Sequence, residues 1–327
     1  MPALFRIGLV GAGRMGRNHL RALSGSARVA VAAIAEPSPQ SRRRLTGAGL
    51  TGAGPAGAGP TVHASLAEML DRCALDGILI AAPSDQHLPI ISEAAGHGLP
   101  ILCEKPCGVN SRQTRAAAGT AAAAGVPLQV AYWRRFFPVL RQLRDRVAAG
   151  ELGAIHLVTC YQWDERPPPA AYRAHSGGIA IDMGVHEFDQ LRWLTGQDIS
   201  SLSATAPALT ADADVTEDVD SAQMIATMSA GTVGFVSLGR HHPAGDMARS
   251  EVFGTRGTVR CDFLDPADGE RAQLDALRRQ AAGFADFVAG AEQQGATAAD
   301  ATAALQAAEL ATAAIPALAG QGGRAMT

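Results

Sequence analysis

Charged side chains are scarce in this sequence, and neither sign predominates. Asp, Glu, Lys and Arg together make up 18% of the 327 residues, and 28 basic against 31 acidic residues leave a formal net charge of -3 at pH 7. Proteins that bind nucleic acids usually carry a basic excess, because they neutralise phosphates. The composition therefore argues against a nucleic-acid partner.

Cysteine is also scarce, and it is not arranged as a metal site or a disulfide framework. The cysteines are odd in number and their spacing matches no common zinc pattern: they are Cys73, Cys103, Cys107, Cys160 and Cys261. The pattern predicts free thiols in a reducing compartment.

Long apolar runs are missing. No stretch approaches the roughly 20 apolar residues that span a bilayer, and we see no basic, apolar and small-residue pattern of a secretory signal. We therefore expect a cytoplasmic protein with no membrane partner. At 47% hydrophobic the chain can bury large cores, and its length favours two domains.

The first part of the chain alternates strand and helix patterns. Buried strands are predicted at residues 4–10, 27–35, 76–84, 100–106 and 127–133. Helices fit between them, among them one capped by Ser65 with Glu68 three residues on. This alternation predicts a doubly wound parallel sheet, a Rossmann domain covering residues 1–125. Residues 46–60, almost only Gly, Ala, Pro and Thr, are expected to form a flexible surface loop.

The second part, residues 126–327, has a different pattern. Helices are predicted at about 138–149 and at 180–196, with a strand at 154–163 between them. Several strand-like runs joined by short turns follow, and two Ala-rich helices close the chain. The pattern predicts an α+β domain with a large, open, mostly antiparallel sheet.

A glycine-rich turn joins the first strand to the first helix. Gly11, Gly13 and Gly16 form a G-x-G-x-x-G in the strand–turn–helix context that a dinucleotide requires. The first glycine permits the tight turn, the second lets a pyrophosphate approach the backbone, and the third allows helix and strand to pack closely. We predict a dinucleotide site here that also includes Arg14 and Met15.

Glu36 ends the second predicted strand, at about the expected distance from the glycines. A carboxylate at this place accepts hydrogen bonds from the adenosine ribose and repels a 2′-phosphate, which favours NAD over NADP. The run Arg42, Arg43 and Arg44 could instead bind such a phosphate, and we interpret it as a solvated basic helix face.

Asp182 and His186 are four residues apart in a predicted helix, so both lie on one face. A carboxylate beside an imidazole can orient it and raise its basicity, as a general base requires. An ordinary exposed Asp–His pair remains the alternative. The neighbours Glu187 and Asp189 suggest a metal, but Gln190 stands where the metalloprotease pattern needs a second histidine, so no metal is predicted.

Several motifs together resemble the glucose–fructose oxidoreductase / inositol dehydrogenase / rhizopine-catabolism family, and most closely its inositol 2-dehydrogenase-like members. They are GLVGAGRMGRNHLRAL (8–23), AAPSDQH (81–87), CEKP (103–106), AYWRRF (131–136) and SGGIAIDMGVHEFDQLRWLTG (176–196), with a weaker match at EVFGTRGTV (251–259).

The resemblance implies an active site formed by Lys105, Asp182 and His186. In the implied reaction a secondary alcohol of a cyclic polyol gives a hydride to NAD, and His186 accepts the hydroxyl proton. Asp182 orients His186, and Lys105 holds the substrate hydroxyl and stabilises developing oxyanion charge. The reverse direction reduces a ketone.

The resemblance also implies supporting residues around this site. Glu104 is expected behind Lys105 as part of the cofactor site, and the bond between Lys105 and Pro106 is expected to be cis. Pro83 and His87 are placed beside the cofactor, with a structural histidine as the alternative for His87.

The predicted substrate side includes Arg134 (or Arg135), Asp164 and Tyr172, with an interdomain or capping salt bridge as the alternative for the arginines. The sequence leaves inositol, amino-cyclitol and pyranose substrates open. An NAD-dependent glycoside hydrolase and a non-catalytic dinucleotide sensor are the alternative functions. The family further implies a homodimer or homotetramer, formed through the second-domain sheet.

Overall fold

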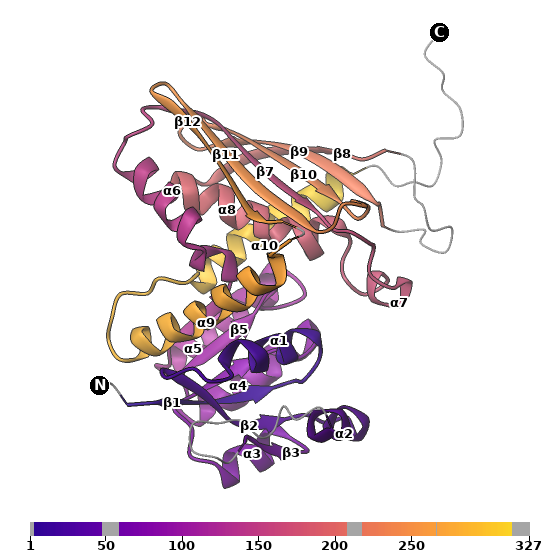
Figure 1. Cartoon of the computed structure of the whole chain (residues 1–327), viewed down its shortest axis with the longest axis vertical. Coiled ribbons are helices and arrows are strands. Elements are labelled where there is room, and N and C mark those ends of the chain that lie inside the picture. Colours follow the sequence, from indigo (N-terminus) through magenta and orange to yellow (C-terminus); the bar gives the residue numbers. More distant parts are fainter. Residues whose placement is uncertain (1–2, 48–58, 208–217, 266, 316–327) are drawn as a thin grey trace. The chain divides into compact units, whose positions relative to one another are not determined.

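The computed structural model describes residues 3–47, 59–207, 218–265 and 267–315, and within them the chain forms two compact units (Figure 1). The first unit comprises Met1–Phe136 and Glu270–Thr302, and the second comprises Phe137–Gly269 and Ala303–Thr327. The first unit thus extends past the predicted boundary at residue 125. The helix α9 (Gly269–Val288), near the end of the chain, also belongs to the first unit, because its apolar side packs into the same core.

The sheet of the first unit is parallel, in the order β3-β2-β1-β4-β5-β6. Its strands are β1 (Phe5–Val10), β2 (Val29–Ala35), β3 (Thr61–His63), β4 (Gly77–Ile80), β5 (Ile101–Glu104) and β6 (Leu128–Ala131). The order reverses between β1 and β4, and ligands bind in such sheets at this switch point. The doubly wound fold is confirmed. The edge strand β3 was not predicted, because three residues give no periodic pattern.

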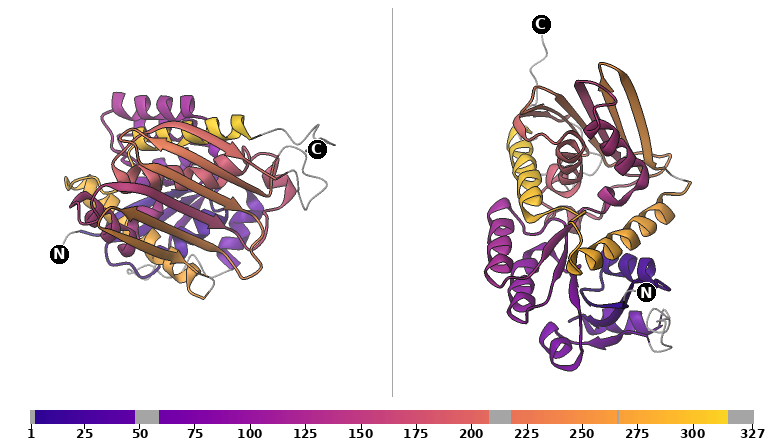
Figure 2. Two further views of the ribbon diagram at one scale, coloured as in Figure 1. Left: turned by 90° about the horizontal axis from the view of Figure 1, so that it is seen from above. Right: turned by 90° about the vertical axis from the view of Figure 1, so that its left-hand side faces the viewer.

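Helices cover both faces of this sheet, as the right-hand view of Figure 2 shows. They are α1 (Arg14–Leu23), α2 (Pro39–Gly47), α3 (Leu66–Arg72), α4 (His87–Gly96), α5 (Ser111–Ala123) and α9 (Gly269–Val288), with short 3-10 turns η1 (Ser84–Gln86) and η2 (Trp133–Phe136). Ser65 caps α3 as predicted, since its hydroxyl accepts the N–H of Glu68 at 3.1 Å. Most of the predicted Gly-rich loop, residues 48–58, lies outside the described residues.

One hydrophobic core joins the strands of the first unit to α9. Leu9, Leu79 and Leu102 are buried in it beside Phe284 of α9, and the ring of Phe5 meets that of Phe284 edge-on at 5.9 Å. Strands covered on both faces read as near-continuous apolar runs. This explains why β1, β4 and β5 are so apolar.

The second unit is a mixed sheet in the order β12-β11-β7-β10-β9-β8. Its strands are β7 (Ile155–Trp163), β8 (Ile199–Thr205), β9 (Ser221–Met228), β10 (Val233–Gly239), β11 (Met247–Gly254) and β12 (Gly257–Leu264). β7 and β10 pair in parallel, and the other pairs are antiparallel. The predicted mostly antiparallel sheet is thus confirmed.

Helices pack on one face of this sheet, and the left-hand view of Figure 2 looks onto the other face, where the strands lie in front. The helical segments are α6 (Pro138–Ala148), α7 (Ala170–Arg173), the π-helical turn η3 (Ala180–Gly184), α8 (Val185–Thr195) and α10 (Ala298–Ala314), whose first residues count with the first unit. The strand β9 alternates accordingly: Ala222, Met224 and Ala226 are buried, whereas Ile225 is exposed.

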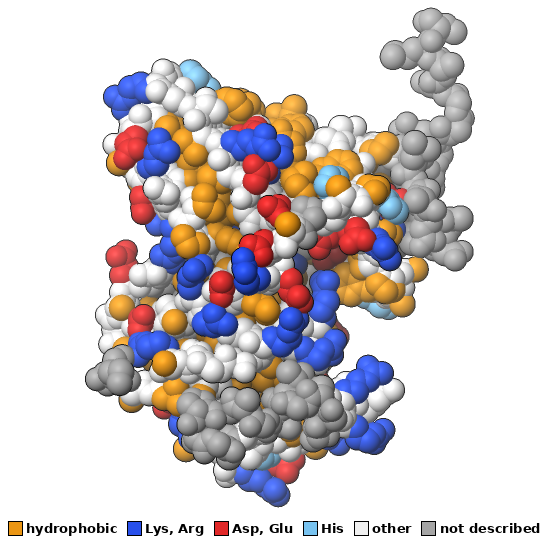
Figure 3. All heavy atoms as spheres, viewed as in Figure 1, with side chains coloured by type: hydrophobic (Ala, Val, Ile, Leu, Met, Phe, Trp, Pro, Cys, Tyr) orange, Lys and Arg blue, Asp and Glu red, His pale blue; other side chains and the backbone are white. Residues whose placement is uncertain are grey.

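The surface matches the balanced composition. Figure 3 shows basic and acidic side chains interspersed over the face in view.

All five cysteines are free thiols. Among the described residues, no helix combines the length and apolarity that crossing a bilayer requires.

Candidate active site

The glycine-rich turn between β1 and α1 has the shape that a dinucleotide needs. Gly11 has φ +91°, a conformation that favours glycine. A Cβ on Gly16 would lie 2.1 Å from the carbonyl oxygen of Gly11, so there is no room for a side chain at Gly16. A Cβ on Gly13 would meet nothing within 4 Å. The backbone is therefore approachable at Gly13, where α1 begins with no side-chain cap and no acidic residue in its first turn. Both features suit a bound pyrophosphate.

Glu36 follows β2 and lies beside this turn. Its carboxylate accepts the backbone N–H of Ala12 and that of Ser38, each at 2.8 Å. The side chain is 7% exposed. The residue thus ties the glycine turn to the end of β2, a role that its spacing alone did not reveal, and each oxygen can still accept a further hydrogen bond.

The predicted basic run lies in α2. Arg42 donates to the carbonyl oxygens of Glu36 and Pro37, at 2.7 and 2.9 Å, whereas Arg43 and Arg44 are exposed. The guanidinium of Arg42 is therefore held by backbone carbonyl oxygens of the segment that follows β2.

Lys105 follows β5 and is half-buried, and the Lys105–Pro106 bond is cis, as the resemblance implied. Glu104 lies behind it and is buried. One carboxylate oxygen of Glu104 lies 2.7 Å from Nε2 of the buried His19 in α1, and the other accepts the N–H of Lys105 at 3.2 Å. The backbone that carries Lys105 is therefore fixed to the helix that begins at the glycine turn.

His87, at the start of α4, is 1% exposed. Its Nδ1 lies 2.9 Å from the carbonyl oxygen of Pro106, and its Nε2 lies 2.9 Å from that of Ala82. Burial lowers its pKa, against the opposite effect of the two carbonyls. A neutral imidazole has one N–H and can donate to only one of them. The ring ties the end of β4 to the E-K-P turn, and a cofactor contact by His87 stays a prediction, as does one by the exposed Pro83.

The arginine pair in η2 is buried. Arg134 stacks its guanidinium 5.9 Å from the centre of the Trp133 ring, and Arg135 forms an ion pair with Asp300 at 3.2 Å. Asp300 also accepts the N–H of Thr297 at the start of α10. Arg135 therefore braces a helix start within the first unit, and substrate contact by Arg134 stays a prediction.

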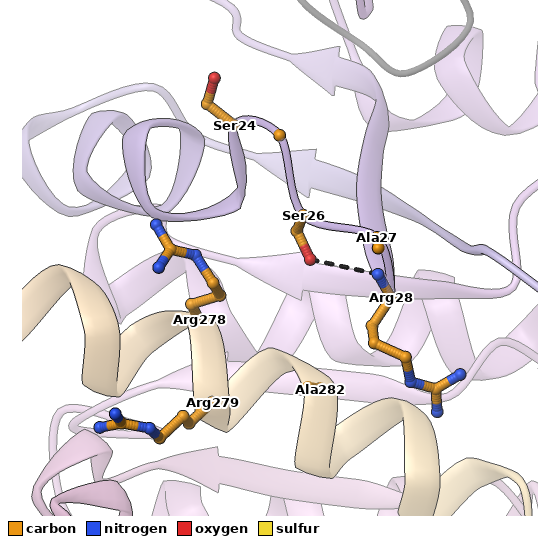
Figure 4. A pocket seen from close by; sticks show the side chains of 8 residues that line it. Ser24, Ser26, Ala27, Arg28, Arg278, Arg279 and Ala282 are labelled. Carbon is orange, nitrogen blue, oxygen red and sulfur yellow. Dashed lines mark hydrogen bonds between the residues drawn. The ribbon is translucent and has the colours of Figure 1, made fainter.

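An open depression of about 450 Å³ lies at the far end of α1 from the glycine turn (Figure 4). It is lined by Ser24, Gly25, Ser26, Ala27, Arg28, Arg278, Arg279 and Ala282. The guanidinium of Arg278 donates to the carbonyl oxygen of Ala22 at 2.8 Å. Because α1 spans about 15 Å at 1.5 Å per residue, this depression is separate from the dinucleotide turn.

In the second unit, Asp182 lies in the π-helical turn η3, and His186 lies in the first turn of α8. His186 is buried, and Asp182 is partly exposed. Single π turns within helices occur frequently at functional sites. The predicted helix is thus present, but it starts with a wider turn that the periodicity did not indicate.

The carboxylate of Asp182 is held from two sides. One oxygen accepts the hydroxyl of Tyr172 at 2.9 Å, and the other accepts a guanidinium N–H of Arg240 at 3.1 Å. Tyr172 is 49% exposed, whereas Arg240 is completely buried. The structure therefore brings the predicted Asp182 and Tyr172 together, and it adds Arg240, which the sequence analysis missed.

Asp164 follows β7 in the same unit. Burial raises its pKa, while the hydrogen bond from Gln162 at 3.0 Å acts in the opposite direction. The charges of Asp246 and Asp182 raise the pKa of Asp164 further. No group of metal-ligating side chains was found in the described parts of the chain.

Two family models cover most of the chain. The oxidoreductase family with an NAD-binding Rossmann fold matches residues 5–132, and the GFO/IDH/MocA C-terminal domain matches residues 140–260.

Individual relatives agree with these matches. The rhizopine catabolism protein MocA of Rhizobium meliloti is 47% identical over 94% of both chains. Inositol 2-dehydrogenase of Rhizobium meliloti (strain 1021) is 32% identical over 84% of this chain and 80% of its own. The crystal structure of a myo-inositol dehydrogenase from Corynebacterium glutamicum ATCC 13032 superposes with a TM-score of 0.84 at 27% identity, covering 96% of this chain and 97% of that one.

The open approach at Gly13, the closed floor at Gly16 and the carboxylate of Glu36 suit NAD, the cofactor of this family. The chain belongs to the GFO/IDH/MocA family of NAD-binding oxidoreductases.

Proposed function

We propose that this protein oxidises a secondary alcohol of a cyclic polyol, an inositol or amino-inositol, and that it reduces the corresponding ketone in reverse. The observation that carries the proposal is the environment of Asp182, which is held between Tyr172 and Arg240 four residues before His186. The names of the relatives, a rhizopine catabolism protein and an inositol dehydrogenase, support the substrate class.

Each residue has a proposed role in its own unit. Gly11, Gly13 and Glu36 bind the cofactor, and bound NAD supplies the hydride acceptor. Lys105 holds the reacting hydroxyl with its ammonium and stabilises negative charge on the oxygen. His186 accepts the hydroxyl proton as general base.

Two further residues are proposed to orient the polyol. Asp182 positions the imidazole of His186 and accepts a hydrogen bond from a neighbouring hydroxyl. Tyr172, half-exposed and bonded to Asp182, borders the place where that hydroxyl would lie. Asp164 is proposed to contact the same substrate.

The test is a substrate panel. The purified protein is mixed with NAD or NADP and with myo-inositol, scyllo-inositol, an amino-inositol or glucose, and nicotinamide absorbance is followed. We expect reduction of NAD with a cyclitol. Absence of turnover with every cyclitol, together with release of sugar from a glycoside, would favour the glycoside hydrolase instead.

We further propose that the protein is a cytoplasmic homodimer or homotetramer that assembles through the helix-free face of the second sheet. Tyr161 and Phe235 meet there, with ring centres 5.9 Å apart, and Ile225 pairs with Phe235 across β9 and β10. Ile225 is 54% exposed. An apolar group of this kind on one face of a sheet suits contact with a second copy.

A further inference from the structure

A buried guanidinium lies between two carboxylates in the second unit. Arg240 follows β10, and its side chain has no exposed surface. One of its terminal nitrogens donates to Asp182 at 3.1 Å, and the other lies 3.0 Å from Asp218. The backbone N–H of Arg240 donates to the carbonyl oxygen of Asp220 at 2.8 Å.

Asp218 is itself fixed. One of its carboxylate oxygens accepts the N–H of Ile179, just before the π turn, and that of Val219, both at 2.9 Å. The other accepts the guanidinium of buried Arg173 at 2.9 Å and faces Arg240. The network therefore ties the start of the π turn to the ends of three other segments.

The cost of burying an unpaired charge determines which groups must lie around Arg240. Removing one partner of a buried ion pair leaves an uncompensated charge and is strongly unfavourable. Arg240 must therefore keep carboxylates around it, and Asp218 alone is already shared with Arg173. Asp182 is the partly exposed member of the group. We infer that the guanidinium of Arg240, at the end of β10, sets the position of the Asp182 carboxylate more than the helical turn η3 does.

We propose that Arg240 is a positioning residue for the reaction: it holds the carboxylate of Asp182 in the orientation that serves His186 and the substrate. This inference rests on the proposed polyol oxidation. Arg240 touches neither substrate nor cofactor in this role and acts through Asp182 alone.

A double-mutant cycle tests it. The variants are Arg240→Gln, Asp182→Asn and the double variant, and kcat and KM are measured with the cyclitol that the wild type oxidises best. Contacting residues couple, so Arg240→Gln should lower kcat by about tenfold or more in the wild-type background and by less than about threefold in the Asp182→Asn background. Arg240→Lys keeps a cation and should recover part of kcat, which a purely structural role would not predict.

Controls separate folding from positioning. Arg146→Gln removes a partly exposed arginine near the end of α6 that pairs with Glu151 at 2.9 Å, and it should leave kcat unchanged. NAD binding, followed by fluorescence, should stay at the wild-type value in every variant, because the glycine turn belongs to the first unit. If Arg240→Gln does not fold, the Arg240→Lys cycle with Asp182→Asn replaces it.

The outcomes are distinct. Equal losses from Arg240→Gln in both backgrounds, with an active wild type, overturn the positioning role and leave the proposed function standing. A wild type that oxidises no cyclitol overturns the proposed function and this inference together.

Discussion

The imidazole Nε2 of His19 lies 2.7 Å from a carboxylate oxygen of Glu104, and both side chains are buried. The pair joins α1, which begins at the glycine turn, to the end of β5, which carries Lys105. The cofactor turn and the lysine therefore share one rigid connection inside the first unit.

Loss of this connection should destabilise the protein. Glu104→Ala leaves the buried imidazole without its acceptor, which costs about 1–3 kcal/mol. Glu104→Gln keeps a carbonyl oxygen at the same place and should lose less. Thermal unfolding with and without NAD measures both variants, and equal losses would contradict a hydrogen-bonding role for Glu104.

Cofactor choice should depend on Glu36. In Glu36→Ala the N–H of Ala12 in the glycine turn and the N–H of Ser38 after β2 each lose a hydrogen bond to a charged oxygen, worth about 1.5–3 kcal/mol. We expect a higher KM for NAD by about ten- to a hundredfold and weaker discrimination against NADP. Steady-state kinetics with both cofactors checks this. A wild-type enzyme with a higher kcat/KM for NADP would refute the assignment and point to Arg43 and Arg44.

His186 should carry the proton transfer. His186→Asn should lower kcat by about 10²–10⁴-fold, the usual contribution of general acid–base catalysis. Dinucleotide affinity should barely change, because the glycine turn binds the other end of the cofactor. Single-turnover kinetics and NAD titration separate the two. Near wild-type turnover would make the Asp182–His186 pair an ordinary helix face.

Stability should fall as the pH rises through the pKa of Asp164. Burial raises this pKa above its usual value near 3.8, so the folded protein holds the proton more tightly than the unfolded chain does. Folding then takes up protons, and the contribution is complete below pH 3.8 and lost as pH passes the raised value. Asp164→Asn removes the titration. Urea midpoints at several pH values should therefore show the wild type losing stability relative to Asp164→Asn as pH rises.

Asp262 provides a control of opposite sign. Its burial acts to raise the pKa but is outweighed by hydrogen bonds from Arg260 and Arg249, which hold the pKa below its usual value. Its contribution is present above the unfolded value and is lost as pH falls. Asp262→Asn should therefore lose stability relative to the wild type at neutral pH, and parallel pH trends for the two variants would contradict both assignments.

The helix-free face of the second sheet should hold the assembly together. Ile225→Glu places a negative charge on its most exposed apolar side chain, and Val233→Glu places a second negative charge nearby on β10, so the two cannot pair with each other. Burying unpaired charge is unfavourable, so the double variant should dissociate. Sedimentation at micromolar concentration measures the mass. A monomeric wild type would refute the proposed interface, and Arg44→Gln, in the first unit, serves as the control.

Features set by neighbours in the sequence could be predicted. The glycine turn, the cap at Ser65 and the alternating strand β9 each depend on a few consecutive residues, and the structure contains all three. Lys105 and its cis bond came from the resemblance, because no local pattern distinguishes them. The pairing of β7 with β10 in parallel could not be read from apolar alternation, which is the same for both directions.

Contacts between distant residues could not be predicted. Arg240 and Asp182 are 58 positions apart, and His19 and Glu104 are 85 apart. No local pattern pairs Arg240 with Asp182 or His19 with Glu104, because each contact depends on the packing of whole elements. The apolar side of α9 predicts that this helix packs against another element. It does not predict that Phe284 joins the hydrophobic core of the first unit.

The return of α9 also determines the order of events during synthesis. Residues 137–269 must be translated before Phe284 can reach the core of the first unit. At about 5–20 residues per second, the ribosome needs on the order of ten seconds for this stretch. Throughout that time the nascent Rossmann sheet exposes the apolar surface that α9 later covers. We therefore expect nascent chains of this protein to bind chaperones until the helix emerges, and chains arrested before residue 270 to remain in that state.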